Sequence, residues 1–364
     1  MHYRVVVFGV KDTSENIISY IRENLCPVDL VVTVAPEVTR KNQISGYRGL
    51  SSLTERYGIP VFEAESYSLR DARTQAFFRE NSFEIGIVMG WQRLIPADVL
   101  GAFRYGIYGF HGNAGYLPFG RGRSPLNWSI ILGDTRFNLN LFRYDEKADS
   151  PNVFATEMFS LTEHDDIRTA QYKNMICSKH LIRRLIAAYQ EAEKSGTQIP
   201  IRTWSKDRDS WYHKRTPEDG RIDWQDRTRN IYNLIRGVAA PFPGAFCRVL
   251  TAEEAAAGGT CAADASDDKG VSGASGIPPA ASASDSSGAP DAGGSSGVSR
   301  AERGVPVTVW EAHPFDEMID FSAYAPGEVI DTFDGKLIVR TVDGSMRIDR
   351  YDCARQITAG DILV

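Results

Sequence analysis

MHYRVVVFGVKDTSENIISYIRENLCPVDLVVTV, residues 1–34, contains two short apolar runs separated by a helical pattern. The runs Val5–Phe8 and Leu30–Val34 are continuous rather than alternating, as expected for strands that are buried on both faces. Between them, Glu15–Asn24 is amphipathic at helical spacing. A strand, a helix and a second strand in this order predict a parallel strand pair with a helical crossover.

The same alternation continues through the first half of the chain and predicts an α/β fold, a Rossmann-like doubly wound parallel sheet. These elements place the first domain at residues 1–200. Further strands are expected at Val61–Phe62, Ile85–Val88, Ile107–Phe110, Phe137–Tyr144 and Val153–Leu161, and further helices at Leu50–Tyr57, Leu69–Glu80 and about Asp166–Lys194.

A second domain is expected at residues 205–364, where short strand-like pieces are separated by Gly and Asp turns. This spacing is typical of a small β-barrel, similar to the OB fold. Residues 252–300 interrupt the domain with Ala, Gly, Ser, Asp and Pro and almost no large apolar side chain. Such a segment buries too little apolar surface to offset the entropy of ordering, so the sequence predicts a disordered insert.

The composition excludes several classes of protein. The chain has 364 residues, 42% hydrophobic and 24% charged, which supports two globular cores without metals or disulfides. Its formal net charge of −6 gives no overall attraction to nucleic acid or to an anionic membrane. The five cysteines are scattered and form no Cys-x-x-Cys pair, which predicts reduced thiols in a cytoplasmic protein and no metal site. No apolar run is long enough for a membrane span, and the first residues lack the pattern of a signal peptide.

The residues that could carry chemistry follow the strand expected at Ile107–Phe110. Residues 108–133 read YGFHGNAGYLPFGRGRSPLNWSIILG. Ligands of open α/β sheets bind beyond the carboxyl ends of the strands. His111 and Asn113 are two residues apart, so in extended chain their side chains point the same way. The next strand ends in DEKADSP, residues 145–151, which brings an acid to the same edge.

Each of these residues also has an ordinary structural interpretation. A single histidine near a turn is usually a surface or core residue, and Asn beside Gly is common in turns. Asp145 and Asp149 fit turn or cap positions. A nicotinamide dehydrogenase is disfavoured, because residues 8–11, FGVK, contain one glycine where the dinucleotide fingerprint needs Gly-x-Gly-x-x-Gly.

Residues 114–125, AGYLPFGRGRSP, resemble the second part of the signature of folate-dependent formyltransferases, N-x-H-x-S-x-L-P-x-x-R-G-x-x-P. Residues 89–96, MGWQRLIP, are similar to the loop that packs against the pterin in small-molecule N-formyltransferases. Residues 215–224, RTPEDGRIDW, and 241–246, PFPGAF, are similar to segments that open the carboxyl-terminal domain of methionyl-tRNA formyltransferase and its relatives. The resemblance covers nearly the whole chain outside the insert.

One feature departs from the family pattern. With the Leu-Pro and Arg-Gly pairs in register, the family's Asn falls on His111 and its His falls on Asn113, so the pair is exchanged. A register that keeps His111 as the family histidine needs two inserted residues and puts Gly109 at the Asn position. Asp149 falls at the family's catalytic aspartate, although the glycine that normally follows it is missing.

The resemblance implies that 10-formyltetrahydrofolate is the formyl donor and that no metal takes part. It implies three catalytic residues: His111 takes a proton from the amine, Asn113 donates to the oxyanion, and Asp149 holds one tautomer of the histidine and stabilises its charged form. Ile95 in the pterin loop fits a core position equally well. The implied cofactor contacts are Trp91, Arg93, Leu94, Ile95, Leu117, Tyr144 and Asp145.

The pterin-loop resemblance favours the amine of a small molecule as the acceptor, either a nucleotide-linked amino sugar or an amino acid derivative. Methionyl-tRNA is an alternative, since the tRNA enzymes carry a basic loop after the second strand and residues 36–49 here hold Arg40, Lys41 and Arg48. A third alternative is a folate-binding or scaffold protein whose exchanged pair has lost activity. No membrane partner is expected, and a homodimer stays open.

Overall fold

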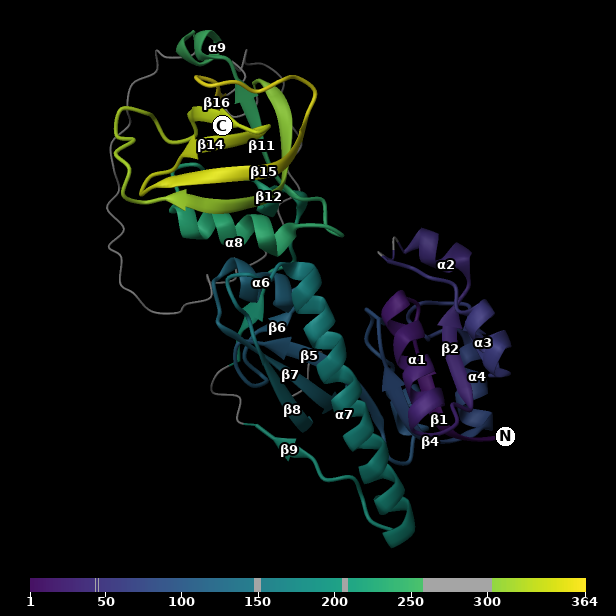
Figure 1. Ribbon diagram of the computed structural model, residues 1–364. Helices are drawn as coiled ribbons and strands as arrows, with labels where there is room; N and C mark the ends of the chain where they lie inside the picture. Colours follow the sequence, from purple (N-terminus) through teal and green to yellow (C-terminus); the bar gives the residue numbers. More distant parts are fainter. Residues whose placement is uncertain (43, 45, 147–151, 205–208, 258–302) are drawn as a thin grey trace, which may run out of the picture. The chain divides into compact units, whose positions relative to one another are not determined.

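The computed structural model describes residues 1–42, 44, 46–146, 152–204, 209–257 and 303–364 (Figure 1). The chain divides into two compact units. Unit 1 holds residues 1–125, 135–160 and 171–211, and unit 2 holds residues 126–134, 161–170 and 212–364. Two short segments of the first half therefore fold with unit 2. One of them is most of helix α6 (Pro125–Ile131), whose Ile131 packs against the core of that unit.

Unit 1 is built on an eight-stranded sheet with the order β3-β2-β1-β4-β5-β7-β8-β9. Strands β1 to β5 pair in parallel, and β7, β8 and β9 are added in antiparallel fashion. Because β2 and β4 lie on opposite sides of β1, the predicted doubly wound sheet is confirmed, with its switch point beside β1. The strands are β1 (His2–Phe8), β2 (Leu30–Val34), β3 (Val61–Ala64), β4 (Ser82–Val88), β5 (Ile107–Asn113), β7 (Arg136–Arg143), β8 (Asn152–Ser160) and β9 (Arg202–Thr203).

Two apolar cores lie on opposite faces of this sheet. Alternate residues of a strand point to opposite faces, so Val5 and Val7 of β1 join one core while Val6 and Phe8 join the other. The first core is covered by α1, α3 and α7, and the second by α4 and α5. The helices are α1 (Asp12–Asn24), α2 (Pro36–Lys41), α3 (Ser51–Tyr57), α4 (Ala72–Glu80), α5 (Ala97–Gly101) and α7 (Ile167–Ser195).

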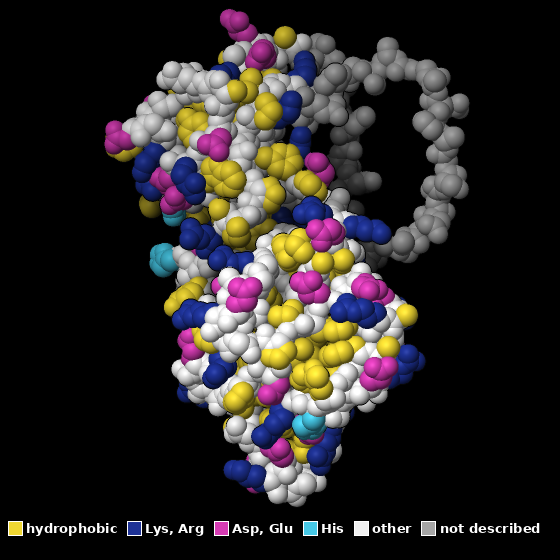
Figure 2. All heavy atoms as spheres, turned by 90° about the vertical axis from the view of Figure 1, so that its right-hand side faces the viewer, with side chains coloured by type: hydrophobic (Ala, Val, Ile, Leu, Met, Phe, Trp, Pro, Cys, Tyr) yellow, Lys and Arg dark blue, Asp and Glu magenta, His cyan; other side chains and the backbone are white. Residues whose placement is uncertain are grey.

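The surface carries charges of both signs. On the face drawn in Figure 2, Lys and Arg side chains are interspersed with Asp and Glu rather than gathered into one field. Among the described residues, no helix is both long and apolar enough to cross a membrane.

Four cysteines lie in the described ranges, and each is a free thiol. Burial raises the pKa of Cys177 to about 11, an effect to which Glu157 adds.

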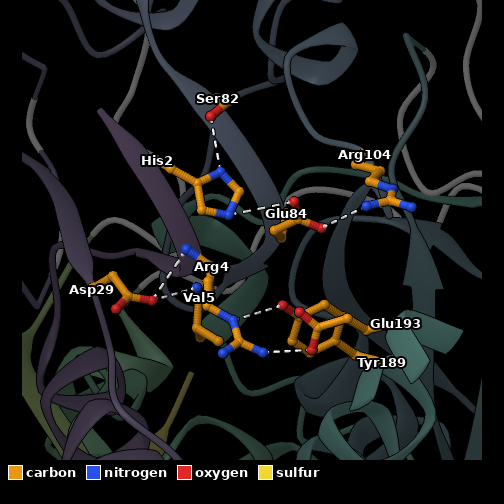
Figure 3. A network of polar contacts seen from close by, with 9 residues as sticks. All are labelled: His2, Arg4, Val5, Asp29, Ser82, Glu84, Arg104, Tyr189 and Glu193. Carbon is orange, nitrogen blue, oxygen red and sulfur yellow. Dashed lines mark hydrogen bonds and ion pairs between the residues drawn. The ribbon is translucent and has the colours of Figure 1, made fainter. Parts of the chain in front are cut away.

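The amino edge of the unit 1 sheet is held by a polar network (Figure 3). The buried carboxylate of Glu84 pairs with His2 at 3.5 Å and with Arg104 at 3.8 Å. Asp29 accepts a hydrogen bond from the backbone N–H of Arg4 at 3.1 Å. These groups form ion pairs and hydrogen bonds at the end of the strands opposite to the carboxyl ends, although Glu84 Oε2 itself has no hydrogen-bond partner among the described residues. The network therefore stabilises the sheet and leaves the carboxyl edge for ligands.

Unit 2 contains a six-stranded antiparallel sheet with the order β13-β14-β15-β12-β11-β16. Its two edge strands meet, because the N–H of Val329 donates to the carbonyl of Asp361 at 2.9 Å and the N–H of Leu363 donates to the carbonyl of Gly327 at 2.8 Å. The sheet thus curls into the small barrel that the sequence predicts, and helix α8 (Thr228–Val238) packs Ile231 on its core. The strands are β11 (Ala245–Leu250), β12 (Val305–Asp316), β13 (Val329–Phe333), β14 (Lys336–Arg340), β15 (Ser345–Cys353) and β16 (Ile362–Leu363).

A carboxylate on the barrel surface binds three basic side chains. Asp349 lies 2.8 Å from Lys336 Nζ, 2.9 Å from His313 Nδ1 and 2.8 Å from Arg347 Nε. Burial would raise the pKa of Asp349, but the hydrogen bonds from these three groups outweigh it and lower the pKa to about 2. The cluster stabilises the folded barrel as long as the carboxyl group is ionised.

The predicted insert lies almost wholly outside the described residues. At its start, where the composition predicts disorder, the structure instead has a short helix, α9 (Ala252–Ala256). The physical reason is a capping box: Thr251 accepts from the N–H of Glu254 at 3.1 Å, and the Glu254 carboxylate accepts from the N–H of Thr251 at 2.8 Å.

Candidate active site

Four polar side chains lie on one face of the sheet at the carboxyl end of β5. In the antiparallel pair of β5 and β7, His111 is opposite Asn140 and Asn113 is opposite Asn138. Because alternate residues share a face, all four point away from the core that takes the neighbouring Leu139. All four are buried, and we call them the polar quartet.

The loop that follows β5, residues 114–122, folds over the polar quartet. His111 Nε2 lies 2.7 Å from the carbonyl oxygen of Gly120. Asn113 donates to the carbonyl of Phe119, and its Oδ1 accepts from the N–H of Gly115 at 2.7 Å. His111 is 7% exposed and Asn113 is 0% exposed. The sequence predicted that both side chains point into one crevice; in the structure the loop covers that crevice and is held by them.

The contact with Gly120 decides which ring nitrogen of His111 carries a proton. A carbonyl oxygen can only accept, so Nε2 must be the protonated nitrogen. In the neutral ring, Nδ1 then holds a lone pair. The choice of tautomer that the sequence assigned to Asp149 stays a prediction, because Asp149 lies outside the described residues.

Residues 209–211, which are far from this loop in the sequence, form hydrogen bonds and a ring contact with it. Ser210 Oγ accepts from the N–H of Gly120 at 2.8 Å, and the Ser210 carbonyl accepts from the N–H of Arg121 at 2.9 Å. The Arg121 guanidinium donates to Asp209 at 2.9 Å and lies 4.7 Å from the centre of the Trp211 ring. The Arg of the family signature therefore has a structural partner, and it fixes the part of the loop that His111 contacts.

The two asparagines of β7 differ in how far their side-chain amides are hydrogen-bonded. Asn140 donates to the carbonyl of His111 at 3.1 Å and accepts from Thr156 Oγ1 at 2.8 Å, so both ends of its amide are bound. Asn138 donates to the carbonyl of Gly115 at 2.7 Å, but its buried Oδ1 has no hydrogen-bond donor among the described residues. An unpaired buried acceptor is unfavourable, and a ligand N–H or O–H would satisfy it.

The predicted pterin loop follows β4 at the same edge of the sheet. Trp91 is 6% exposed and packs on Tyr67 with ring centres 4.8 Å apart, and its indole N–H has no partner in the described ranges. Ile95 is 1% exposed and belongs to the core, whereas Leu94 is 48% exposed. Arg93 lies over the Tyr67 ring at 5.7 Å. The side chains of this loop that a ligand can reach without rearrangement are thus those of Gln92, Arg93 and Leu94.

The remaining predicted contacts lie around the end of β7. Tyr144 stacks on Phe142 with ring centres 5.0 Å apart and lies against Gly109, where a Cβ would come within 2.3 Å of its ring. Leu117 is buried in the small apolar cluster that contains Phe142. Asp145 accepts from Asn152 Nδ2 at 3.2 Å. Asp149 lies outside the described residues, so its role stays a prediction.

Sequence reasoning missed Asn138, Asn140 and Thr156. A signal for the first two was present, since residues 136–143, RFNLNLFR, alternate asparagine with large apolar residues. Such alternation indicates a strand with one polar face, and that face belongs to the site. No group of three or more His, Cys, Asp or Glu side chains that could hold a metal is found in the part of the chain that the structure describes.

Two family models match the sequence. Residues 3–182 match the model described as "Formyl transferase", and residues 214–260 match "Formyl transferase, C-terminal domain". The first match spans β1 to the middle of α7 and includes the polar quartet and the loop that covers it. The second begins in unit 2 ahead of η2 (Pro217–Gly220) and extends past β11.

Solved structures share the fold at low sequence identity. An N-formyltransferase from Helicobacter canadensis, in complex with folinic acid and dTDP-3-aminofucose, is 12% identical with a TM-score of 0.56, over 96% of this chain and 99% of that one. WlaRD, a sugar 3N-formyl transferase, is 12% identical with a TM-score of 0.54, over 98% of this chain and 99% of that one. HypX from Aquifex aeolicus, in complex with tetrahydrofolic acid, is 17% identical with a TM-score of 0.52, over 98% of this chain. The chain spans less than half of HypX, 45% of its length.

Proposed function

Because this chain belongs to the formyl transferase family, we propose that it transfers a formyl group from 10-formyltetrahydrofolate to the amine of a small molecule. The observation that carries the proposal is the polar quartet at the carboxyl end of β5, beneath the loop that carries the Leu-Pro and Arg-Gly part of the signature. Acyl transfer to an amine needs a group that accepts a proton and a group that donates a hydrogen bond to the developing oxyanion. An imidazole can do the first and a side-chain amide can do the second.

In the proposed reaction the amine nitrogen attacks the formyl carbon and gives a proton to His111. The bond from that carbon to N10 of the folate then breaks as the protonated His111 gives that proton to N10, so that tetrahydrofolate leaves as the neutral amine. His111 accepts the amine proton at Nδ1, the nitrogen that the Gly120 contact leaves unprotonated in the neutral ring. Asn113 donates to the formyl oxygen with its second N–H, since Phe119 takes only one. Asn113 is fully buried, so this role requires the loop 114–122 to move when substrate binds. Asp149 keeps its predicted role of stabilising the protonated ring.

The folate site proposed from the sequence fits the chemistry of the pterin loop. A pterin is a flat ring with donors and acceptors on its edges, and it needs aromatic or aliphatic faces together with nearby polar groups. Leu94 presents an exposed apolar side chain, and the buried indole N–H of Trp91 lacks a partner among the residues that the structure describes. Both residues come directly after β4, beside β5 in the sheet. The structures of HypX and of the Helicobacter canadensis enzyme contain folates, which supports the same ligand for this chain.

Methionyl-tRNA is the weaker candidate acceptor. The loop expected to contact tRNA contains Arg40, Lys41 and Arg48. Two of these three cations are paired with acids: Arg40 with Glu37 at 3.0 Å and Arg48 with Glu15 at 2.6 Å. Paired cations attract phosphate less strongly than free ones. A small amine is therefore the preferred acceptor, and the Helicobacter canadensis complex with a nucleotide-linked amino sugar supports this class.

The test is turnover with a panel of amines. The purified chain is mixed with 10-formyltetrahydrofolate and nucleotide-linked amino sugars, amino acid derivatives or methionyl-tRNA, and both tetrahydrofolate and the N-formyl product are measured. Formylation of one small amine, lost in His111→Ala, would support the proposal. Tight folate binding without turnover of any amine would favour the inactive relative, and turnover of methionyl-tRNA alone would select the tRNA alternative.

A further inference from the structure

One row of side chains crosses the sheet at the polar quartet, from a buried residue to an exposed one. Its middle member is Asn138 on β7, the strand between β5 and β8 (Figure 1). Asn138 is opposite Asn113 of β5 and opposite Met158 of β8. Residues directly opposite each other in antiparallel strands share a face, so the three side chains are neighbours. Asn113 is 0% exposed, Asn138 is 1% exposed and Met158 is 57% exposed.

The orientation of the Asn138 amide is fixed by the loop that covers it. Its Nδ2 lies 2.7 Å from the carbonyl oxygen of Gly115, which can only accept, so the nitrogen must face that carbonyl. The N–H of the same glycine donates to Asn113 Oδ1 at 2.7 Å. Two asparagine amides therefore hold the two polar groups of one residue, which keeps these amides close together.

The oxygen of Asn138 differs from those of the other two asparagines in the quartet. Asn113 Oδ1 accepts from Gly115, and Asn140 Oδ1 accepts from Thr156 at 2.8 Å. Asn138 Oδ1 is buried and has no donor among the described residues. A buried hydrogen-bond acceptor without a donor is destabilising in the free protein, and it is satisfied when a ligand brings an N–H or O–H group.

We propose that Asn138 binds the amine substrate and that its Oδ1 accepts one N–H of the reacting nitrogen. The inference rests on the proposed formyl transfer and narrows the substrate to primary amines. A neutral primary amine has one lone pair and two N–H bonds. The lone pair forms the bond to the formyl carbon, and one N–H gives its proton to His111. The second N–H stays on the nitrogen and donates to Asn138 in the substrate and in the amide product. A secondary amine has only the N–H that His111 takes.

The position of Asn138 suits this role. Its neighbour Asn113 is the proposed donor to the formyl oxygen, so the carbon under attack is held beside it. Asn140 Nδ2 lies 3.1 Å from the carbonyl oxygen of His111 and 3.3 Å from that of Asn138, which brings these two backbone groups together. Met158 offers an exposed apolar side chain to the carbon skeleton of the amine. Binding requires the movement of the loop 114–122 that the role of Asn113 already requires.

The experiment compares a primary amine with its N-methyl derivative as substrates of the full chain. The probes are dTDP-3-aminofucose and N-methylated dTDP-3-aminofucose, or the corresponding pair for another amine that the panel identifies. Asn138→Leu neither donates nor accepts, and Asn138→Asp keeps an acceptor oxygen but cannot donate to Gly115 when ionised. Asn24→Leu is the matched control, because the exposed Asn24 amide also donates to a backbone carbonyl, that of Tyr20 at 3.0 Å. Hydrogen exchange of the peptide 114–122 reports separately on the loop, and thermal unfolding reports on the fold.

We expect the unmodified chain and Asn24→Leu to prefer the primary amine by at least about tenfold in kcat/KM. Asn138→Leu should lose this preference, because only the primary amine loses a hydrogen bond. A looser loop slows both amines alike and cancels in the ratio. Asn138→Asp should keep the preference, and its kcat should reach a plateau at higher pH, because a carboxylate beside the nitrogen stabilises the ammonium form of the bound amine.

Two results would overturn the assignment while the proposed function stands. One is an unmodified chain that formylates both amines equally well. The other is an Asn138→Leu variant that keeps the preference while its loop exchanges faster, since Asn138 then acts only through Gly115. If Asn138→Leu does not fold, loss of the preference in Asn138→Asp overturns the assignment instead. A chain that formylates no amine counts against the proposed function itself, and the assignment fails with it.

Discussion

Replacing His111 by Gln and by Ala separates its chemical role from its structural one. The Gln side chain can still donate an N–H to the carbonyl of Gly120, which lies 2.7 Å from Nε2 in the structure, but it cannot take up a proton. We expect His111→Gln to change the free energy of unfolding by less than about 1 kcal/mol. Its turnover should fall by about 10²–10⁴, the usual contribution of positioned proton transfer.

The Ala variant removes the hydrogen bond and the ring together. Gly120 is buried, so its carbonyl would lose a donor at a cost of about 1–3 kcal/mol, to which the cavity left by the ring adds. Hydrogen exchange of the loop peptide 114–122 reports this locally: His111→Ala should exchange faster, and His111→Gln should match the unmodified chain. The reasoning would be refuted by His111→Gln turning over within about threefold of the unmodified enzyme, or by His111→Ala leaving loop exchange unchanged.

Three further predictions concern packing, charge and thiol reactivity. Gly112→Ala should destabilise unit 1 by about 1–3 kcal/mol in thermal or urea unfolding, because the new Cβ would lie 2.1 Å from the ring of Phe137; Gly101→Ala, with open space around it, should be neutral or slightly stabilising. Asp349→Asn should cost about 1–2 kcal/mol at pH 7, after allowance for its partly exposed partners. The native pKa of Asp349 is about 2 against an ordinary value of 3.8, so this deficit should shrink as the pH falls from about 4 toward 2; a deficit that is the same at pH 7 and at pH 3 would contradict the ion-pair explanation. Cys177, with a pKa of about 11, should react at pH 8 with an aromatic disulfide at least about tenfold more slowly than a model thiol, as measured by mass spectrometry of its peptide.

Most of the fold could be predicted from the sequence because its signals are strong and local. The run Leu30–Val34 coincides with β2, and the helix expected at about Asp166–Lys194 is α7, Ile167–Ser195. Strands buried on both faces and long amphipathic helices leave periodic patterns that survive in a single sequence. No pattern in the sequence indicates that residues 126–134 and 161–170 belong to unit 2. Their assignment depends on which apolar core their side chains contact in the folded chain.

The candidate site was predicted in part. The positions of His111 and Asn113 on one strand face follow from the two-residue period of a strand. Their partners could not be predicted, because the carbonyls of Phe119 and Gly120 and the N–H of Gly115 are backbone groups that every residue has.

The backbone of the loop also gives a physical reason for the exchanged order of His and Asn. Position 113 faces both an acceptor, the carbonyl of Phe119, and a donor, the N–H of Gly115. An amide satisfies both from one end of a short side chain, whereas the two nitrogens of an imidazole point away from each other. Position 111 faces a single carbonyl, which one imidazole N–H satisfies. The order found here therefore matches the backbone groups that this loop presents. It sets the imidazole about 7 Å further back along β5 than the family order would, since two strand residues span that length. In the proposed formyl transfer the amine consequently has to reach deeper beneath the loop.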